Sequence, residues 1–198
     1  MKPHISDGEA LKAYREEELP VHLNEKEVFD LLKLRLYNIN EWKGYFTVPA
    51  PEFLLTDNKG NQKKNLPEPG DYIRIDLPGP GTSTGSGYDW VRIEFIKETN
   101  SNLYNRYLVM KVRPSQNPET GTNETAHFYT GNSFSEFCVG QEGQKLYGWV
   151  KAGGEEPNLK EASGLLNKLR NLAVGITAKA GMSAIQWEQF IRGLLQFN

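Results

Sequence analysis

Histidine, cysteine and acidic side chains most often carry chemistry, and in this sequence the first two are few and scattered. His4, His22 and His127 lie far apart, Cys138 is the single cysteine, and neither HxxxH nor HExxH occurs. A zinc site needs several such ligands at close spacing. We therefore expect no metal and no cofactor, and we expect Cys138, inside an apolar run, to be a buried packing residue.

Two weaker patterns could support nucleophilic or acid–base chemistry. Ser133 and Ser135 follow His127 closely, but no GxSxG motif accompanies them. Glu155 and Glu156 follow two glycines and precede a proline, and this position favours acids in the first turn of a helix over a catalytic base. An enzyme would need a polar cluster inside a cavity. The sequence does not assemble one, so we predict no catalytic residue.

A glycine-rich segment, PGPGTSTGSG at residues 78–87, is the part of the chain closest to a phosphate-binding loop. Such a loop carries a lysine and leads directly into a helix. This segment has no lysine, and a strand pattern follows it. We expect a hairpin connection, with a flexible lip over a pocket or a partner surface as the alternative.

The composition argues against nucleic acid and membranes as partners. The 198 residues carry 23 basic and 25 acidic side chains, so no overall field attracts nucleic acid or an anionic surface. Tyr72, Arg74 and Arg92 come closest to a nucleic-acid-binding face, but Asp76 and Glu94 interrupt it. The first twenty residues carry charges throughout, and no run of eighteen apolar residues occurs. We expect a cytoplasmic protein without membrane insertion.

The N-terminal segment has a helix-start signal. Ser6 and Glu9 have the spacing of a capping box, which predicts a helix over residues 7–18 that ends before Pro20. Few apolar residues lie in this segment. We therefore expect residues 1–18 to be a helical extension outside the main domain.

Residues 19–198 are expected to form a single α+β domain. A short strand is expected at residues 19–23, where LPVHL alternates. Asn24 and Glu27 have the spacing of a second capping box, and the helix that follows is apolar over more than one stripe. We expect this helix to be buried on most of its circumference.

Period-two alternation predicts an antiparallel sheet of about six or seven strands, with no βαβ pattern. Besides residues 19–23, the segments that alternate or are apolar are 72–77, 90–96, 106–113, 127–130, 133–139 and 146–151. In the central hairpin, the residues expected to face the core are Ile73, Ile75, Leu77, Val91, Ile93 and Phe95. On the outer face, Arg74 and Asp76 are expected to pair with Glu94 and Arg92.

The C-terminal segment predicts two helices that cover the sheet. The first begins at Asn158 and ends before Gly181. The second begins at Ser183, and its apolar residues follow helical spacing: Trp187, Phe190, Ile191, Leu194 and Leu195. Both helices need a large apolar partner, which the sheet can supply.

The order of these elements resembles the helix-grip fold of the START-like, polyketide-cyclase-like (SRPBCC) superfamily. The segments that carry the resemblance are LPVHL, the helix NEKEVFDLLKLRL, the turn NEW, the strands, and the helical end that opens at EEPN. The resemblance covers residues 19–198 in layout. It implies a curved antiparallel sheet around a C-terminal helix, with a hydrophobic cavity between them. Gly181 departs from this layout because it splits the helix, and no catalytic residue is transferred.

Two functions are consistent with the sequence. The first rests on this resemblance and on the aromatic content of 11%, and the second rests on the absence of a motif for chemistry and on the two amphipathic C-terminal helices. The first is a small-molecule binding module for an apolar ligand, with these residues lining or gating the cavity: Trp42, Trp90, Arg92, Tyr107, Arg113, His127, Tyr129 and Trp149. The alternative is a non-enzymatic protein-interaction module, an adaptor or chaperone of a bacterial complex. Its partner would bind the C-terminal helices at Trp187 and Phe190, or the central hairpin loop.

Overall fold

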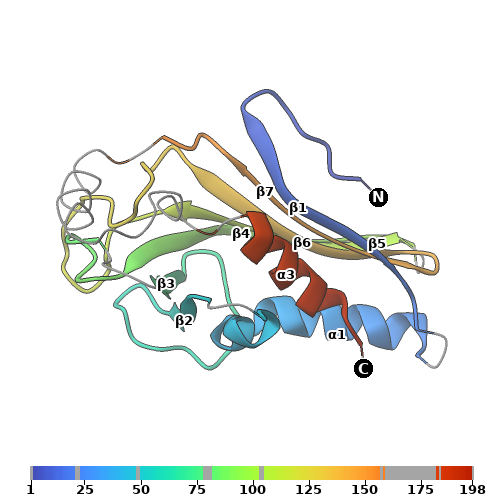
Figure 1. Ribbon diagram of the computed structural model, residues 1–198. Coiled ribbons are helices and arrows are strands. Elements are labelled where there is room, and N and C mark those ends of the chain that lie inside the picture. The colour runs from blue at the N-terminus through green and yellow to red at the C-terminus, as the bar shows by residue number, and fades with distance from the viewer. Residues whose placement is uncertain are drawn as a thin grey trace.

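The computed structural model describes residues 2–20, 23–47, 50–77, 82–102, 105–156, 158, 182 and 184–197. They form a seven-stranded antiparallel sheet in the order β1-β7-β6-β5-β4-β3-β2. The strands are β1 (Glu9–Glu18), β2 (Glu52–Thr56), β3 (Tyr72–Asp76), β4 (Asp89–Asn102), β5 (Asn105–Pro114), β6 (Phe134–Glu142) and β7 (Lys145–Gly153). The sheet curves around the helices α1 (Glu25–Tyr37) and α3 (Ala184–Leu195) and the 3-10 helix η1 (Ile39–Tyr45) (Figure 1).

This architecture confirms the expected fold class, an α+β protein with a helix-grip-like layout. One apolar core lies between the concave face of the sheet and the helices. Along β5, Leu108, Met110 and Val112 face this core and are buried, as the period of a strand requires. The predicted C-terminal helix is confirmed in α3, where Phe190 and Leu194 are fully buried.

The prediction of a helical extension at residues 1–18 is wrong, because residues 9–18 form the edge strand β1. The contact between Ser6 and Glu9 does form, since the Ser6 N–H donates to the Glu9 carboxylate at 2.9 Å. It closes a turn in which Gly8 has φ +82°, a conformation that favours glycine. The segment is a strand because β7 offers it an unpaired edge, and their ladder runs from Glu9–Gly153 to Glu18–Lys145.

The predicted alternation along β4 is correct only as far as Ile93. A register shift between Ile93 and Phe95 interrupts the pairing with β5, and an extra residue of this kind reverses the faces of the residues after it. Ile96 therefore packs against the core, and Phe95 is exposed.

The predicted outer-face ion pairs of the central hairpin are also wrong. Arg74 lies opposite Trp90, and its guanidinium stacks 4.4 Å from the centre of the Tyr88 ring. Glu94 instead accepts a hydrogen bond of 2.6 Å from Arg113 of the neighbouring strand β5. The difference arises because β4 pairs on both sides, and β5 supplies the nearer cation.

The first helix begins as predicted, since the Asn24 side chain accepts a hydrogen bond from the Glu27 N–H. The expectation that it is buried on most of its circumference is wrong. Leu31 and Leu34 are 40% and 55% exposed, because only one face of α1 meets the sheet. The predicted strand at residues 19–23 lies partly outside the described residues, and Leu19 and Pro20 are not in a strand.

The predicted strand at residues 127–130 is a loop. The ring nitrogen Nδ1 of His127 accepts a hydrogen bond of 2.9 Å from the Tyr129 backbone N–H, so this backbone group is not available to a strand ladder. The predicted C-terminal helix after Asn158 and residues 78–81 of the hairpin loop lie outside the described residues. Among the helices that the structure describes, none is long and apolar enough to cross a membrane.

Candidate ligand pocket

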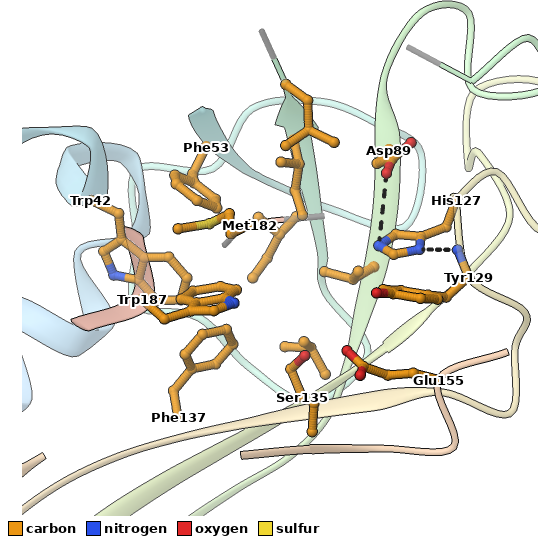
Figure 2. A pocket seen from close by; sticks show the side chains of 16 residues that line it. Trp42, Phe53, Asp89, His127, Tyr129, Ser135, Phe137, Glu155, Met182 and Trp187 are labelled. Carbon is orange, nitrogen blue, oxygen red and sulfur yellow. Dashed lines mark hydrogen bonds and ion pairs between the residues drawn. The ribbon is translucent and has the colours of Figure 1, made fainter. Parts of the chain in front are cut away.

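A pocket with a cavity volume of about 80 Å³ lies between the concave face of the sheet and α3. Its wall comes from segments far apart in the chain (Figure 2). The residues that line it are Trp42, Phe53, Ile73, Ile75, Leu77, Asp89, Val91, Val112, His127, Tyr129, Ser135, Phe137, Ala152, Glu155, Met182 and Trp187. Apolar and polar side chains gather at opposite ends (Figure 2).

The apolar end is built from aromatic rings. Trp42 of η1 is central, with ring centroids 5.3 Å from Phe53 and 5.1 Å from Phe137. The ring centroid of Trp187 in α3 lies 5.3 Å from that of Phe137. Trp42 also donates its indole N–H to the Leu36 carbonyl at 3.1 Å. This bond and the tilted ring contacts fix the wall as a preformed apolar surface.

The polar end combines Asp89, His127, Tyr129, Ser135 and Glu155 (Figure 2). Asp89 is the first residue of β4, and Ser135 is on β6. Glu155 follows the end of β7, and His127 and Tyr129 lie on the loop between β5 and β6. Four segments therefore place titratable or hydroxyl side chains around one end of the pocket.

The loop that carries His127 is held by the segment after β7. Asn158 donates its side-chain amide to the carbonyls of Thr125 and His127 at 3.1 and 3.2 Å. Its backbone N–H donates to the Phe128 carbonyl at 2.7 Å. Such asparagine contacts replace the ladder bonds that an irregular loop lacks, so His127 has a fixed position at the pocket.

His127 is a neutral imidazole at physiological pH. Its Nε2 atom lies 3.9 Å from the Asp89 carboxylate, which favours the charged imidazolium. Burial of the ring, opposed by the hydrogen bond with the Tyr129 backbone, nevertheless lowers the pKa of His127 to about 4. Because Nδ1 accepts the Tyr129 N–H, the single ring proton resides on Nε2.

Tyr129 and Glu155 form the other half of the polar end. Burial, together with the charge and hydrogen bond of Glu155, raises the pKa of Tyr129 to about 12. The phenol is therefore protonated at neutral pH and acts as a hydrogen-bond donor. Glu155 also pairs with Lys12 of β1, so the edge strand helps to position this carboxylate.

The arrangement suits hydrogen bonding better than nucleophilic catalysis. A serine nucleophile needs a base that can take its proton. In His127 the Nδ1 lone pair is already used by the Tyr129 N–H, and Nε2 carries the proton, so Ser135 has no activating base in this ring. Among the residues that the structure describes, no group of three or more His, Cys, Asp or Glu side chains could hold a metal ion.

Three of the eight predicted site residues, Trp42, His127 and Tyr129, line the pocket. Trp90 lies elsewhere, fully buried, with its indole N–H donating to the Gly85 carbonyl at 3.3 Å. Arg92 is exposed on β4. The position of Trp90 follows from the alternation of β4, in which its neighbour Val91 faces the pocket.

The remaining three predicted residues lie on the strands β5 and β7, outside the pocket lining. Tyr107 and Trp149 pack 6.4 Å apart in a cluster around Cys138, separate from the main core. Arg113 bonds Glu94 and the carbonyls of residues 131–133, so it fastens the start of β6. Ligand binding therefore stays a prediction for Trp42, His127 and Tyr129, which line the pocket.

Several pocket residues had no signal in the sequence as ligand contacts. Asp89 opens a strand and resembles any turn acid, and Phe53 lies on β2, a strand that was not predicted. Ser135 and Glu155 stood out in the sequence only as weak catalytic candidates. Ile73 and Val91 could have been found, because their strand alternation places them on the core face.

The chain was compared with protein families, curated proteins and solved structures. No protein-family model matches the chain, and no curated protein matches its sequence. Among solved structures, it is similar to a norcoclaurine synthase point mutant from Thalictrum flavum in complex with a transition-state analogue. The two share 8% identity and a TM-score of 0.39, over 97% of this chain and 98% of the other.

Proposed function

We propose that this protein binds a small apolar molecule in the pocket between the sheet and α3. The observation that carries the proposal is the division of the pocket, with Trp42, Phe137 and Trp187 at one end and His127 and Asp89 at the other. Small-molecule sites combine such a preformed aromatic wall with a few converging polar groups. The helix-grip layout and the resemblance to the START-like superfamily agree with this proposal.

The alternative, a protein-interaction module at the C-terminal helices, has less support. The residues that would contact a partner are directed inward, because Phe190 is fully buried and Trp187 lines the pocket. A surface that binds a protein partner needs large side chains available to solvent. In contrast, Trp187 can contact a small molecule in its observed position, because it lines the pocket.

The proposal is tested by filling the pocket. Val112 lines it and is buried, whereas Val109 lies in the outer cluster around Cys138. Binding of a panel of naphthalene-based ligands, lipids and polyketides is measured by thermal shift and by tryptophan fluorescence, since Trp42 and Trp187 line the site. Val112→Phe is expected to weaken binding at least about tenfold, and Val109→Phe is expected to leave it unchanged.

Equal binding by both variants would place the ligand elsewhere. The absence of any ligand-dependent shift across the panel would remove the proposal of an apolar ligand. Far-ultraviolet circular dichroism of each variant is the control for a retained fold.

A further inference from the structure

The polar end of the pocket contains a pair of groups with a defined gap between them. Nε2 of His127 and the Asp89 carboxylate are 3.9 Å apart, and both side chains line the pocket. This distance is too long for a direct hydrogen bond. It is shorter than two hydrogen bonds placed end to end, about 5.6 Å. A single oxygen atom at the pocket side can therefore lie within hydrogen-bonding distance of both.

The two groups make opposite demands on that oxygen. Nε2 of His127 carries the ring proton and donates, because Nδ1 accepts the Tyr129 N–H. The Asp89 carboxylate accepts, and its two oxygens offer about four lone-pair sites, so it can accept in addition to its other contacts. The bridging atom must accept from one group and donate to the other.

We propose that the pocket selects apolar molecules that end in a neutral hydroxyl group, an alcohol or a phenol, which bridges His127 and Asp89. This inference rests on the proposed function and deepens it. The hydroxyl oxygen accepts the Nε2–H of His127 and donates its own hydrogen to Asp89. The apolar body of the molecule then extends toward Trp42 and Phe137 at the opposite end (Figure 2).

The other common polar groups satisfy only one of the two partners. An ammonium group only donates, so it opposes the His127 Nε2–H. A ketone or an ether only accepts, so it leaves its oxygen facing the Asp89 carboxylate. A ligand carboxylate adds repulsion from Asp89 and Glu155, because none of the described lining residues is a lysine or an arginine.

The experiment uses the full chain and ligands with one apolar body. Dissociation constants of 2-naphthol, 2-methoxynaphthalene, naphthalene and 2-naphthoate are measured at pH 7 by calorimetry or fluorescence. We expect 2-naphthol to bind at least about tenfold more tightly than each of the others, because charge-assisted hydrogen bonds are the strong ones. Equal binding of 2-naphthol and 2-methoxynaphthalene would overturn the inference while leaving the binding of apolar molecules intact.

A matched pair of variants assigns the selection to Asp89. Asp89→Leu is expected to reduce the preference for 2-naphthol over 2-methoxynaphthalene to within about twofold. Asp76→Leu, at an exposed position outside the pocket, is expected to retain it. A preference that persists in Asp89→Leu would also overturn the inference. The comparison of ligands on the unaltered chain decides the question even if Asp89→Leu does not fold.

Discussion

Burial determines what His127 can do at the pocket. An exposed histidine changes its charge close to neutral pH, but this ring is buried beside a carboxylate and keeps one proton. Its Nδ1 atom accepts a backbone N–H two residues along the chain, which fixes the tautomer. The hydrogen bonds of Asn158 hold the loop in place, and the contact with the Tyr129 N–H sets the orientation of the ring and its donor atom.

This depressed pKa predicts a dependence of stability on pH. His127 has a pKa of about 4 in the folded protein, against an ordinary value of 6.5. Between these values the unfolded state binds the additional proton, so stability is full above about pH 6.5 and falls as the pH drops toward 4. The loss from this residue is expected to reach about 3 kcal/mol.

The measurement is urea unfolding at several values between pH 7 and 4.5. His127→Asn, whose amide oxygen can replace Nδ1 as an acceptor, is expected to flatten the pH dependence. His4→Asn, at an exposed position, is the control and is expected to retain it. Identical pH profiles for His127→Asn and the unaltered protein would contradict the prediction.

At the scale of elements, the edge strand β1 is the clearest difference between expectation and structure. Its sequence has few apolar residues. The Ser6–Glu9 contact that predicted a helix start does form, but it closes a turn before the strand. Strand pairing with β7 depends on an edge more than 120 residues away in the chain, as the Glu18–Lys145 pair shows. Local pattern cannot report such a partner.

The strand assignment predicts how charges are tolerated in this segment. Ala13 lies opposite Val150, is 7% exposed and belongs to the main core, whereas Ala10 is exposed. Ala13→Asp buries a carboxylate without a partner and is expected to cost about 3 kcal/mol or more of unfolding free energy. Ala10→Asp is expected to change it by less than about 0.5 kcal/mol. The unfolding free energies are measured with urea. Equal changes for Ala13→Asp and Ala10→Asp would indicate that the segment does not pack on the core.

The docking of α3 gives a second prediction at this scale. A Cβ atom at Gly193 would lie close to backbone and side-chain atoms of Tyr45 in η1, whereas one at Gly44 would meet nothing within 4 Å. Alanine favours a helix over glycine by about 1 kcal/mol, but displacing packed backbone typically costs about 1–3 kcal/mol. We expect Gly193→Ala to destabilise the protein despite its better helix propensity. A rise in its unfolding midpoint relative to Gly44→Ala would contradict this contact.

At the scale of the whole molecule, the parts that sequence predicts are those whose periodicity is local. The amphipathic α3, the central hairpin and the strands β5 to β7 all have such patterns. The pocket does not, because its wall is drawn from η1, the six strands β2 to β7, connecting segments and α3. Asp89 and His127 are 38 residues apart, and only the folded sheet brings them to 3.9 Å. Residue types alone gave no reason to pair them.

A ligand bound in the pocket is expected to protect Cys138, on the opposite face of the sheet, from a thiol reagent. Cys138 is fully buried in the outer cluster, and burial raises the pKa of its thiol well above the ordinary value. Because the thiolate is the reactive form, labelling of Cys138 by a thiol reagent is expected only when the sheet opens. A ligand in the pocket on the opposite face stabilises the closed sheet by RT ln(1 + [L]/Kd).

Labelling should therefore slow by about 100-fold when 2-naphthol is present at 100 times its Kd. The rate is followed with an excess of reagent in native buffer, under conditions in which reclosing is faster than labelling. Val112→Phe, with its pocket filled, should show no such slowing at the same ligand concentration. An unchanged rate at saturation in the unaltered protein would mean that Cys138 is reached by a local opening of the outer face, independent of the core that the pocket shares with α3.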